Sequence, residues 1–103
     1  MGTDQPRMTT QTLKVLGALM SRTQDEISGA EIARSTKLAS GTLYPILLRL
    51  EEAGWVESRW ETADPHELGR PRRRLYKATG FGARRARAAF RELVVPLKEF
   101  AWR

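Results

Sequence analysis

Apolar residues recur along this chain mostly at helical intervals, and in one central part at strand intervals. The first helical pattern covers residues 10–22 and carries one stripe, formed by Leu13, Leu16, Leu19 and Met20. Polar residues at 24–26 have the composition of a turn. We therefore expect an amphipathic helix over residues 10–22.

The residues after this turn predict a second, short helix with a clear start. Ser28 and Glu31 fit a capping box, in which the serine hydroxyl accepts from the Glu31 N–H and the glutamate reaches back to the Ser28 N–H. Ile27 and Ile32 stand at the hydrophobic-staple positions around this box. We expect the helix to run to about Lys37 and a tight turn to follow it.

Residues 40–54 predict a third amphipathic helix. Its apolar face follows the i, i+3, i+4, i+7 spacing with Leu43, Ile46, Leu47 and Leu50. Its outer face is small and nearly uncharged, with Gly41, Thr42, Tyr44, Pro45, Leu48 and Arg49. Together with the preceding short helix and turn, it forms a helix-turn-helix pattern.

The start of this third helix has two interpretations. If Ser40 is the N-cap, Pro45 lies inside the helix and removes a backbone hydrogen bond. If Thr42 is the N-cap, Pro45 falls in the first turn at little cost. The end is clearer, because Gly54 is a natural C′ residue.

The rest of the chain predicts a β-hairpin and one more helix. Residues 55–61 and 73–79 are rich in aromatic and β-branched residues, and the polar stretch 62–72 between them predicts a long loop with turns, partly disordered in the free protein. A helical stripe then follows with Ala86, Phe90, Leu93, Val94, Leu97 and Phe100. Pro96 should kink or break this last helix near Val95.

Charge adds a candidate partner to this picture. The net charge is +6, from 18 Lys and Arg against 12 Asp and Glu, which favours a polyanion. Residues 69–91 hold nine basic residues and no acid, whereas residues 51–67 hold six acids and one arginine. An Arg-Pro-Arg sequence at the hairpin tip, Arg70 to Arg72, is suited to a narrow minor groove of DNA.

The same sequence argues against several other classes of protein. The absence of Cys and the single His exclude most zinc sites and a cysteine nucleophile, so we expect no enzyme, no metal and no cofactor. No apolar run is long enough to span a membrane, and residues 1–9 read as a polar tail without a signal peptide. We therefore expect a cytoplasmic protein.

Several of these residues also resemble a known family. The motif Gly41-Thr42-Leu43-Tyr44-Pro45, the Gly54-Trp55-Val56 sequence and the basic Gly69-to-Arg73 segment resemble the short form of the PadR-like transcriptional regulators. The resemblance continues through residues 76–79 and Gly82, and it covers nearly the whole chain from Thr10.

The resemblance implies a mainly α (α+β) fold. This is a winged helix-turn-helix of three helices and a two-stranded β-wing over residues 10–79, with an added dimerisation helix over residues 80–103. Double-stranded DNA is the implied partner. The expected contacts from the third helix and the turn before it are Lys37, Ser40, Gly41, Thr42, Tyr44 and Arg49, and those from the wing are Arg70, Arg72 and Arg73.

The last helix has an apolar stripe that a small domain cannot bury alone, which predicts a homodimer. The expected interface consists of Phe90, Leu93, Val94, Leu97 and Phe100. Phe100 and Trp102 are either ordinary interface anchors or part of a pocket for a small hydrophobic effector, as some relatives have. The expected function is transcriptional regulation, by default repression. The alternative is a winged-helix module that binds an acidic protein.

Overall fold

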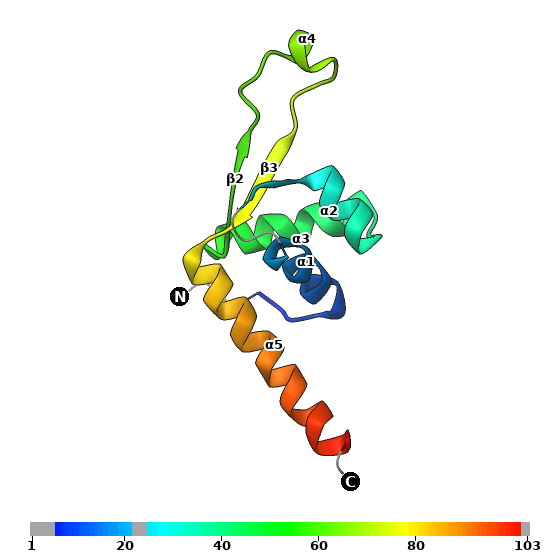
Figure 1. The fold of residues 1–103 in the computed structure, drawn as a ribbon, viewed down its shortest axis with the longest axis vertical. Coiled ribbons are helices and arrows are strands. Elements are labelled where there is room, and N and C mark those ends of the chain that lie inside the picture. Colours follow the sequence, from blue (N-terminus) through cyan, green and yellow to red (C-terminus); the bar gives the residue numbers. More distant parts are fainter. Residues whose placement is uncertain (1–5, 22–24, 102–103) are drawn as a thin grey trace.

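The computed structural model of the chain describes residues 6–21 and 25–101, and for residues 94–101 it describes the backbone course alone. Its elements are α1 (Thr10–Met20), β1 (Ile27–Ser28), α2 (Gly29–Thr36), α3 (Ser40–Glu52), β2 (Val56–Trp60), α4 (Pro65–Leu68), β3 (Arg74–Ala78) and α5 (Gly80–Ala101). Helices α1 to α3 form the body of the molecule, from which the β2–β3 hairpin projects in one direction and α5 in the other (Figure 1). This is the winged helix-turn-helix that the sequence predicts.

The helix-turn-helix begins and ends where local chemistry requires it. The capping box of Ser28 and Glu31 is present at the start of α2, with the Glu31 N–H donating to Ser28 Oγ at 3.1 Å. Lys37 ends α2 in the left-handed conformation, with φ of 60°. Helix α3 ends in a Schellman arrangement, because Gly54 has φ of 81° and the Trp55 N–H donates to the Leu50 carbonyl at 2.9 Å.

The sheet has three antiparallel strands in the order β1-β3-β2, one more than the two-stranded wing expected from the sequence. The additional strand is β1, whose Ile27 pairs with Tyr76 of β3. It consists of two residues, too few for a pattern of alternation. On the other side of β3, Ser58 pairs with Tyr76 and Trp60 pairs with Arg74, so these four side chains share one face of the sheet.

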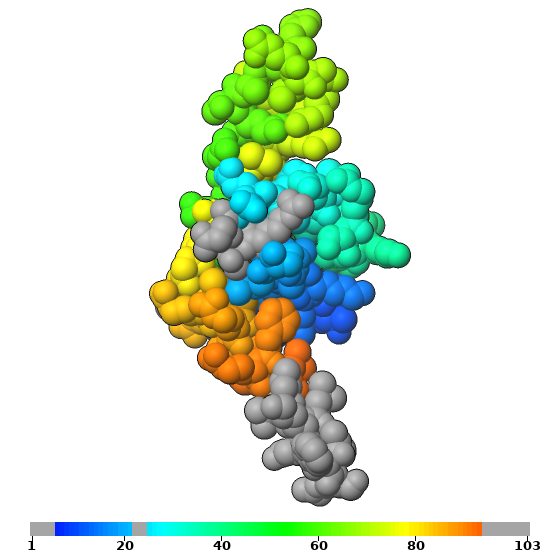
Figure 2. Space-filling model, viewed as in Figure 1, coloured from blue at the N-terminus to red at the C-terminus, as the bar shows by residue number. Residues whose placement is uncertain are grey.

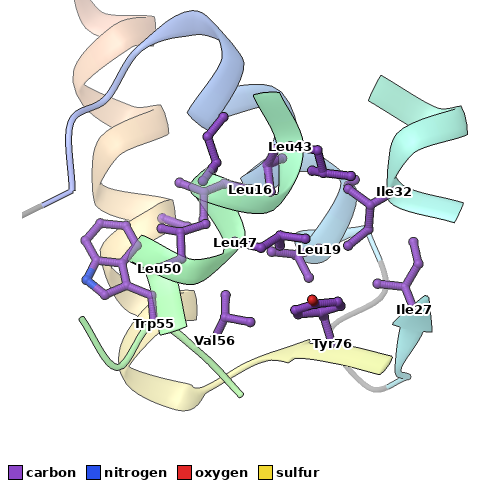
Figure 3. Close-up of a cluster of buried hydrophobic side chains, with 14 residues drawn as sticks. Leu16, Leu19, Ile27, Ile32, Leu43, Leu47, Leu50, Trp55, Val56 and Tyr76 are labelled. Atoms are coloured by element: carbon purple, nitrogen blue, oxygen red, sulfur yellow. The ribbon is translucent and has the colours of Figure 1, made fainter. Parts of the chain in front are cut away.

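The hydrophobic core lies where α1, α3 and the sheet meet (Figure 3). The apolar face predicted for α3 is confirmed, and its members are all buried: Leu43, Ile46, Leu47 and Leu50. The staple residues Ile27 and Ile32 are buried in the same cluster. The outer face of α3 is thereby held towards solvent.

The start of α5 is fixed against the end of α3 by a close backbone approach. The Thr79 hydroxyl donates to the Gly54 carbonyl at 2.7 Å and accepts from the Gly82 N–H at 2.9 Å. A Cβ atom at Gly82 would overlap the Trp55 carbonyl oxygen, so only glycine fits here. This junction sets the direction in which α5 leaves the body.

One further detail differs from the sequence-based expectation, and one alternative that the sequence left open is decided. The predicted loop 62–72 contains the helical turn α4, with Asp64 as its N-cap and Gly69 following it at φ of 70°. Pro96 does not end the last helix, because the α5 backbone continues to Ala101. Within the described part of the chain, no helix has the length and apolar character needed to cross a bilayer.

Candidate nucleic-acid interface

The outer face of α3 is exposed along its whole length, as the sequence predicts. Ser40, Gly41 and Thr42 form its first turn, and all three are exposed to solvent. Within the described part of the chain, neither the Ser40 nor the Thr42 hydroxyl has a hydrogen-bond partner. Both hydroxyls are therefore available to an external group.

The N-cap of α3 is Ala39, so both interpretations of its start, Ser40 or Thr42, were wrong. Ala39 supplies no side-chain hydrogen bond, and its carbonyl accepts from the Leu43 N–H at 2.9 Å. Pro45 consequently lies inside the helix. Because proline has no N–H, the Gly41 carbonyl lacks its usual donor four residues on. The outer face thus offers a carbonyl acceptor as well as hydroxyls.

Tyr44 lies beside this face and packs against the start of α2. Its side chain is 43% exposed, and a Cβ atom at Gly29 would come within 2.5 Å of its hydroxyl oxygen. The ring and its hydroxyl are thus held against the backbone of α2. Sequence had left open a half-buried core position for Tyr44, and it does not belong to the buried core cluster.

The two basic residues predicted outside the wing are both exposed. Lys37 lies in the turn that joins α2 to α3, and Arg49 lies in the last turn of α3. They therefore stand at opposite ends of α3. The centre of the outer face between them thus carries no charge.

The predicted wing arginines differ in their environments. Arg70 forms a bidentate ion pair with Glu61, in which Nη1 lies 2.7 Å from Oε1 and Nη2 lies 3.1 Å from Oε2. The Arg73 backbone N–H also donates to this carboxylate, at 2.8 Å. These bonds, the Arg70 bond first, lower the pKa of Glu61 to about 2.

Arg72 is the more available of the predicted wing residues. Its side chain is exposed, and its Nε donates to the Ala63 carbonyl at 3.0 Å. Within the described residues, no carboxylate pairs with it. Arg72 therefore carries an uncompensated positive charge, whereas the charge of Arg70 is balanced by Glu61.

The structure adds two wing residues that sequence reasoning missed, Trp60 and Arg74. Arg74 Nε donates to Ser58 Oγ at 3.0 Å, and its guanidinium carbon lies 5.2 Å from the centre of a Trp60 ring. The Ser58 hydroxyl donates in turn to Glu51 Oε2 of α3, at 2.7 Å. Strand alternation from the aromatic Tyr76 would have placed Arg74 on the same face, whereas the position of Trp60 follows only from its pairing with Arg74.

These elements line an open pocket of about 480 Å³ between the wing and the helix-turn-helix. One side is the beginning of α2, around Gly29, and Tyr44 of α3 forms another. The wing closes it with Trp60 and the three consecutive arginines 72–74. The pocket therefore combines aromatic rings with positive charge, and it joins the outer face of α3 to the wing.

The predicted dimer residues lie on α5, far along the chain from this pocket. Phe90 is partly buried against the core of its own chain, whereas Leu93 is 45% exposed. Leu93 also lines a second hollow of about 280 Å³ with Met8 and Leu13. The side chains of Val94, Leu97 and Phe100, and the whole of Trp102, lie outside the described residues.

The fold places the chain in the class of winged-helix proteins. A family model, that of the PadR-like transcriptional regulators, matches residues 18–88. This is most of the winged helix-turn-helix and the first part of α5. The chain belongs to the PadR-like family of transcriptional regulators.

Solved structures show the same fold at low sequence identity. A transcriptional regulator homologue from Pyrococcus horikoshii OT3 is 21% identical, with a TM-score of 0.72, over 86% of this chain and 81% of that one. MepR of S. aureus in its DNA-binding conformation is 19% identical, with a TM-score of 0.69, over 91% of this chain and 64% of that one. A MepR–DNA complex of S. aureus matches with a TM-score of 0.67 at 19% identity, over 91% of this chain and 70% of that one.

The chain therefore spans less than two thirds of the MepR chain in its DNA-binding conformation. A search of curated proteins found no match.

Proposed function

We propose that this protein is a sequence-specific DNA-binding transcriptional regulator, which represses by binding a pseudo-palindromic operator as a homodimer. The main support is the exposed first turn of α3, where hydroxyls without internal partners stand beside a basic wing. The family match and the likeness to a solved regulator–DNA complex agree with this proposal.

In this proposal α3 enters the major groove with its N-terminal half. Ser40 and Thr42 offer hydroxyls to phosphates or base edges, and Gly41 allows the backbone to come close. Tyr44 reaches a phosphate, and Lys37 and Arg49 hold the helix at its two ends. Arg72 extends from the wing towards the adjacent minor groove, with Arg70 and Arg73 beside it.

The apolar surface along α5 supports the homodimer. Leu93 is exposed next to a hollow that Met8 and Leu13 also line, and an apolar surface of this kind favours burial against another chain. Phe90, Val94, Leu97 and Phe100 continue the same stripe in the sequence. Two-fold pairing would present two α3 helices to successive major grooves. A small hydrophobic effector bound near Phe100 and Trp102 would release the operator.

The test begins with selection of bound fragments from a random DNA pool, which yields the operator. Binding to this operator and to random duplex is then compared for the wild type and three variants. Thr42→Ala should weaken operator binding about fivefold, the value of one hydrogen bond, and change random-duplex binding less. Tyr44→Phe removes a phosphate contact and should weaken binding to both DNAs by a similar factor. Arg72→Ala should weaken both and reduce the salt slope by about 1.

Wild-type affinity should fall about 10³–10⁵-fold between 50 and 200 mM salt if 6–10 phosphates are contacted. An equal loss on both DNAs for Thr42→Ala as well would refute α3 as the reading element. If the pool yields no enriched sequence and gel shifts retain no DNA, the alternative holds, and the basic face binds an acidic protein.

A further inference from the structure

Two residues that line the pocket between the wing and α2, Trp60 and Arg74, are not among the proposed DNA contacts. Trp60 is 57% exposed, the largest exposed fraction among the large apolar side chains described. Its indole N–H has no hydrogen-bond partner within the described residues. A tryptophan so exposed on a wing is typical of a surface that contacts another molecule.

The charges around Trp60 favour an anion. Arg72, Arg73 and Arg74 all line the pocket. Among the described residues, the carboxylate that approaches Arg74 is that of Glu51, whose Oε2 lies 3.9 Å from Arg74 Nη2 and also accepts from Ser58. The first turn of α2 lies on the opposite side, but there the Glu31 carboxylate of the capping box already offsets the helix dipole, so the arginines carry the attraction.

The position of the pocket between α3 and the wing indicates which anion would bind there. A winged helix that reads the major groove with α3 and touches the minor groove with its wing must let one DNA strand pass between the two elements. The pocket lies at this passage, because Tyr44 of α3 and Arg72 of the wing both line it. Its volume of about 480 Å³ is within the range of about 300–1,000 Å³ found for ligand-sized groups.

We propose that this pocket seats one sugar–phosphate unit of the DNA backbone, with Trp60 against the deoxyribose and Arg74 on the phosphate. The inference rests on the proposed function and adds two contacts to it. Ser58 acts as a positioning residue, because it holds the Arg74 guanidinium at 3.0 Å.

The chain contains a matched control for both contacts. Arg85 and Phe81 on α5 form a second exposed cation–π pair, with 4.9 Å from the guanidinium carbon to the ring centre, and neither residue lines the pocket. Phe81→Ala and Arg85→Gln therefore remove an equivalent ring and an equivalent charge. Trp60→Ala and Arg74→Gln are compared with them.

The measurement is the affinity for a mixed-sequence duplex at several salt concentrations. Arg74→Gln should reduce the salt slope by about 1 more than Arg85→Gln does, and Arg74→Lys should restore it. Trp60→Ala should weaken binding about tenfold with the slope unchanged, as loss of a few tens of Å² of apolar contact would give. Trp60→Phe should stay near the wild type. Thermal unfolding of each variant checks that the fold is kept.

Three results would overturn the inference, and they are distinguishable. If Trp60→Ala and Arg74→Gln bind like their controls while the wild type binds DNA, the pocket does not seat the backbone and the proposed function stands. If the wild type retains no duplex, the proposed function fails and the inference fails with it. Competition by inorganic phosphate at constant ionic strength, strong enough to displace the duplex from the wild type, would identify a free-anion site instead.

Discussion

The structure of the free protein gives no reason for a glycine at position 41. It occupies the second position of α3, and a Cβ atom there would meet nothing within 4 Å. Glycine within a helix costs about 0.5–1 kcal/mol relative to alanine, so the monomer gains nothing from it. Close approach of an external surface to the α3 backbone accounts for a glycine at this exposed place.

The replacement Gly41→Ala should therefore separate stability from binding. We expect the free energy of unfolding to rise by up to about 1 kcal/mol, because alanine is the better helix former. Operator affinity should fall several-fold, since a methyl group now stands between the helix and DNA. Denaturant unfolding and gel shifts measure the two effects.

Gly17→Ala is the matched control, because Gly17 also lies in a helix with open space around it. It should raise stability similarly and leave DNA binding unchanged. A Gly41→Ala variant that binds the operator as tightly as the wild type would show that no partner approaches this residue.

At the scale of elements, the wing is held together by Glu61. Its carboxylate accepts from both the Arg70 side chain and the Arg73 backbone, across the base of the segment that contains α4. The Glu61 N–H donates to the Arg73 carbonyl at 2.9 Å, which extends the pairing of β2 and β3 by one step. Ionised Glu61 therefore keeps the arginines of the wing in place.

The lowered pKa of Glu61 sets a pH range for this effect. A carboxyl group whose pKa is lower in the folded state stabilises the fold above its unfolded pKa of about 4.3 and loses this contribution as pH falls towards the folded value. The wing should thus stay ordered at neutral pH and loosen between about pH 4.3 and 2. Carboxyl NMR should show Glu61 titrating with a pKa of about 2.

Arg70→Gln should raise this pKa towards its ordinary value, because it removes the main stabilising hydrogen bond. Arg72→Gln removes the same charge from the wing without touching Glu61, so it should leave the pKa nearly unchanged. If the two variants move the Glu61 pKa equally, general charge and not the ion pair is responsible.

The sequence predicted the long elements well and the short ones poorly. Periodicity placed α3 correctly because burial of Leu43 and Leu47 fixes which face turns inward. It missed β1, which forms only through pairing with a strand about fifty residues away. The turn α4 was also not predicted, although the sequence carries its signal. Asp64, Pro65 and Gly69 have the order of N-cap, first helical residue and the glycine that follows a helix end.

The candidate site was predictable in its helix and less so in its wing. Spacing alone exposes Thr42 and Tyr44, since they fall opposite the apolar stripe. It does not show that Arg70 is paired with Glu61, because that contact depends on how the segment 62–72 folds back. Nor does it show Trp60 beside Tyr44, which requires the wing to be placed relative to α3.

At the scale of the whole molecule, the chain is elongated. Its radius of gyration is 15.4 Å, compared with about 13 Å for a compact domain of this length. The wing and α5 account for the difference, because they project from opposite sides of the body (Figures 1 and 2). A helix of 22 residues is about 33 Å long, and α5 packs mainly against α1 and β3.

Such a shape is expected of a protomer that completes its fold with a second copy. If α5 forms the dimer interface, Leu93→Glu should give a monomer of 11.7 kDa in sedimentation experiments, where the wild type has twice that mass. A glutamate at this place would bury a charge in an apolar interface, which is strongly unfavourable without a partner. Because Leu93 is exposed within the protomer, the substitution should leave the fold of the single chain intact.

Leu48→Glu provides the control, since Leu48 is an exposed leucine on the outer face of α3 and lies outside the predicted interface. This variant should remain a dimer. A monomeric wild type, or a Leu93→Glu variant of unchanged mass, would contradict the role given to α5. The wild-type dimer should bind the full operator far more tightly than a single half-site, because it holds two α3 helices about one turn of DNA apart. Monomeric Leu93→Glu should lose this preference and bind the operator about as weakly as a half-site.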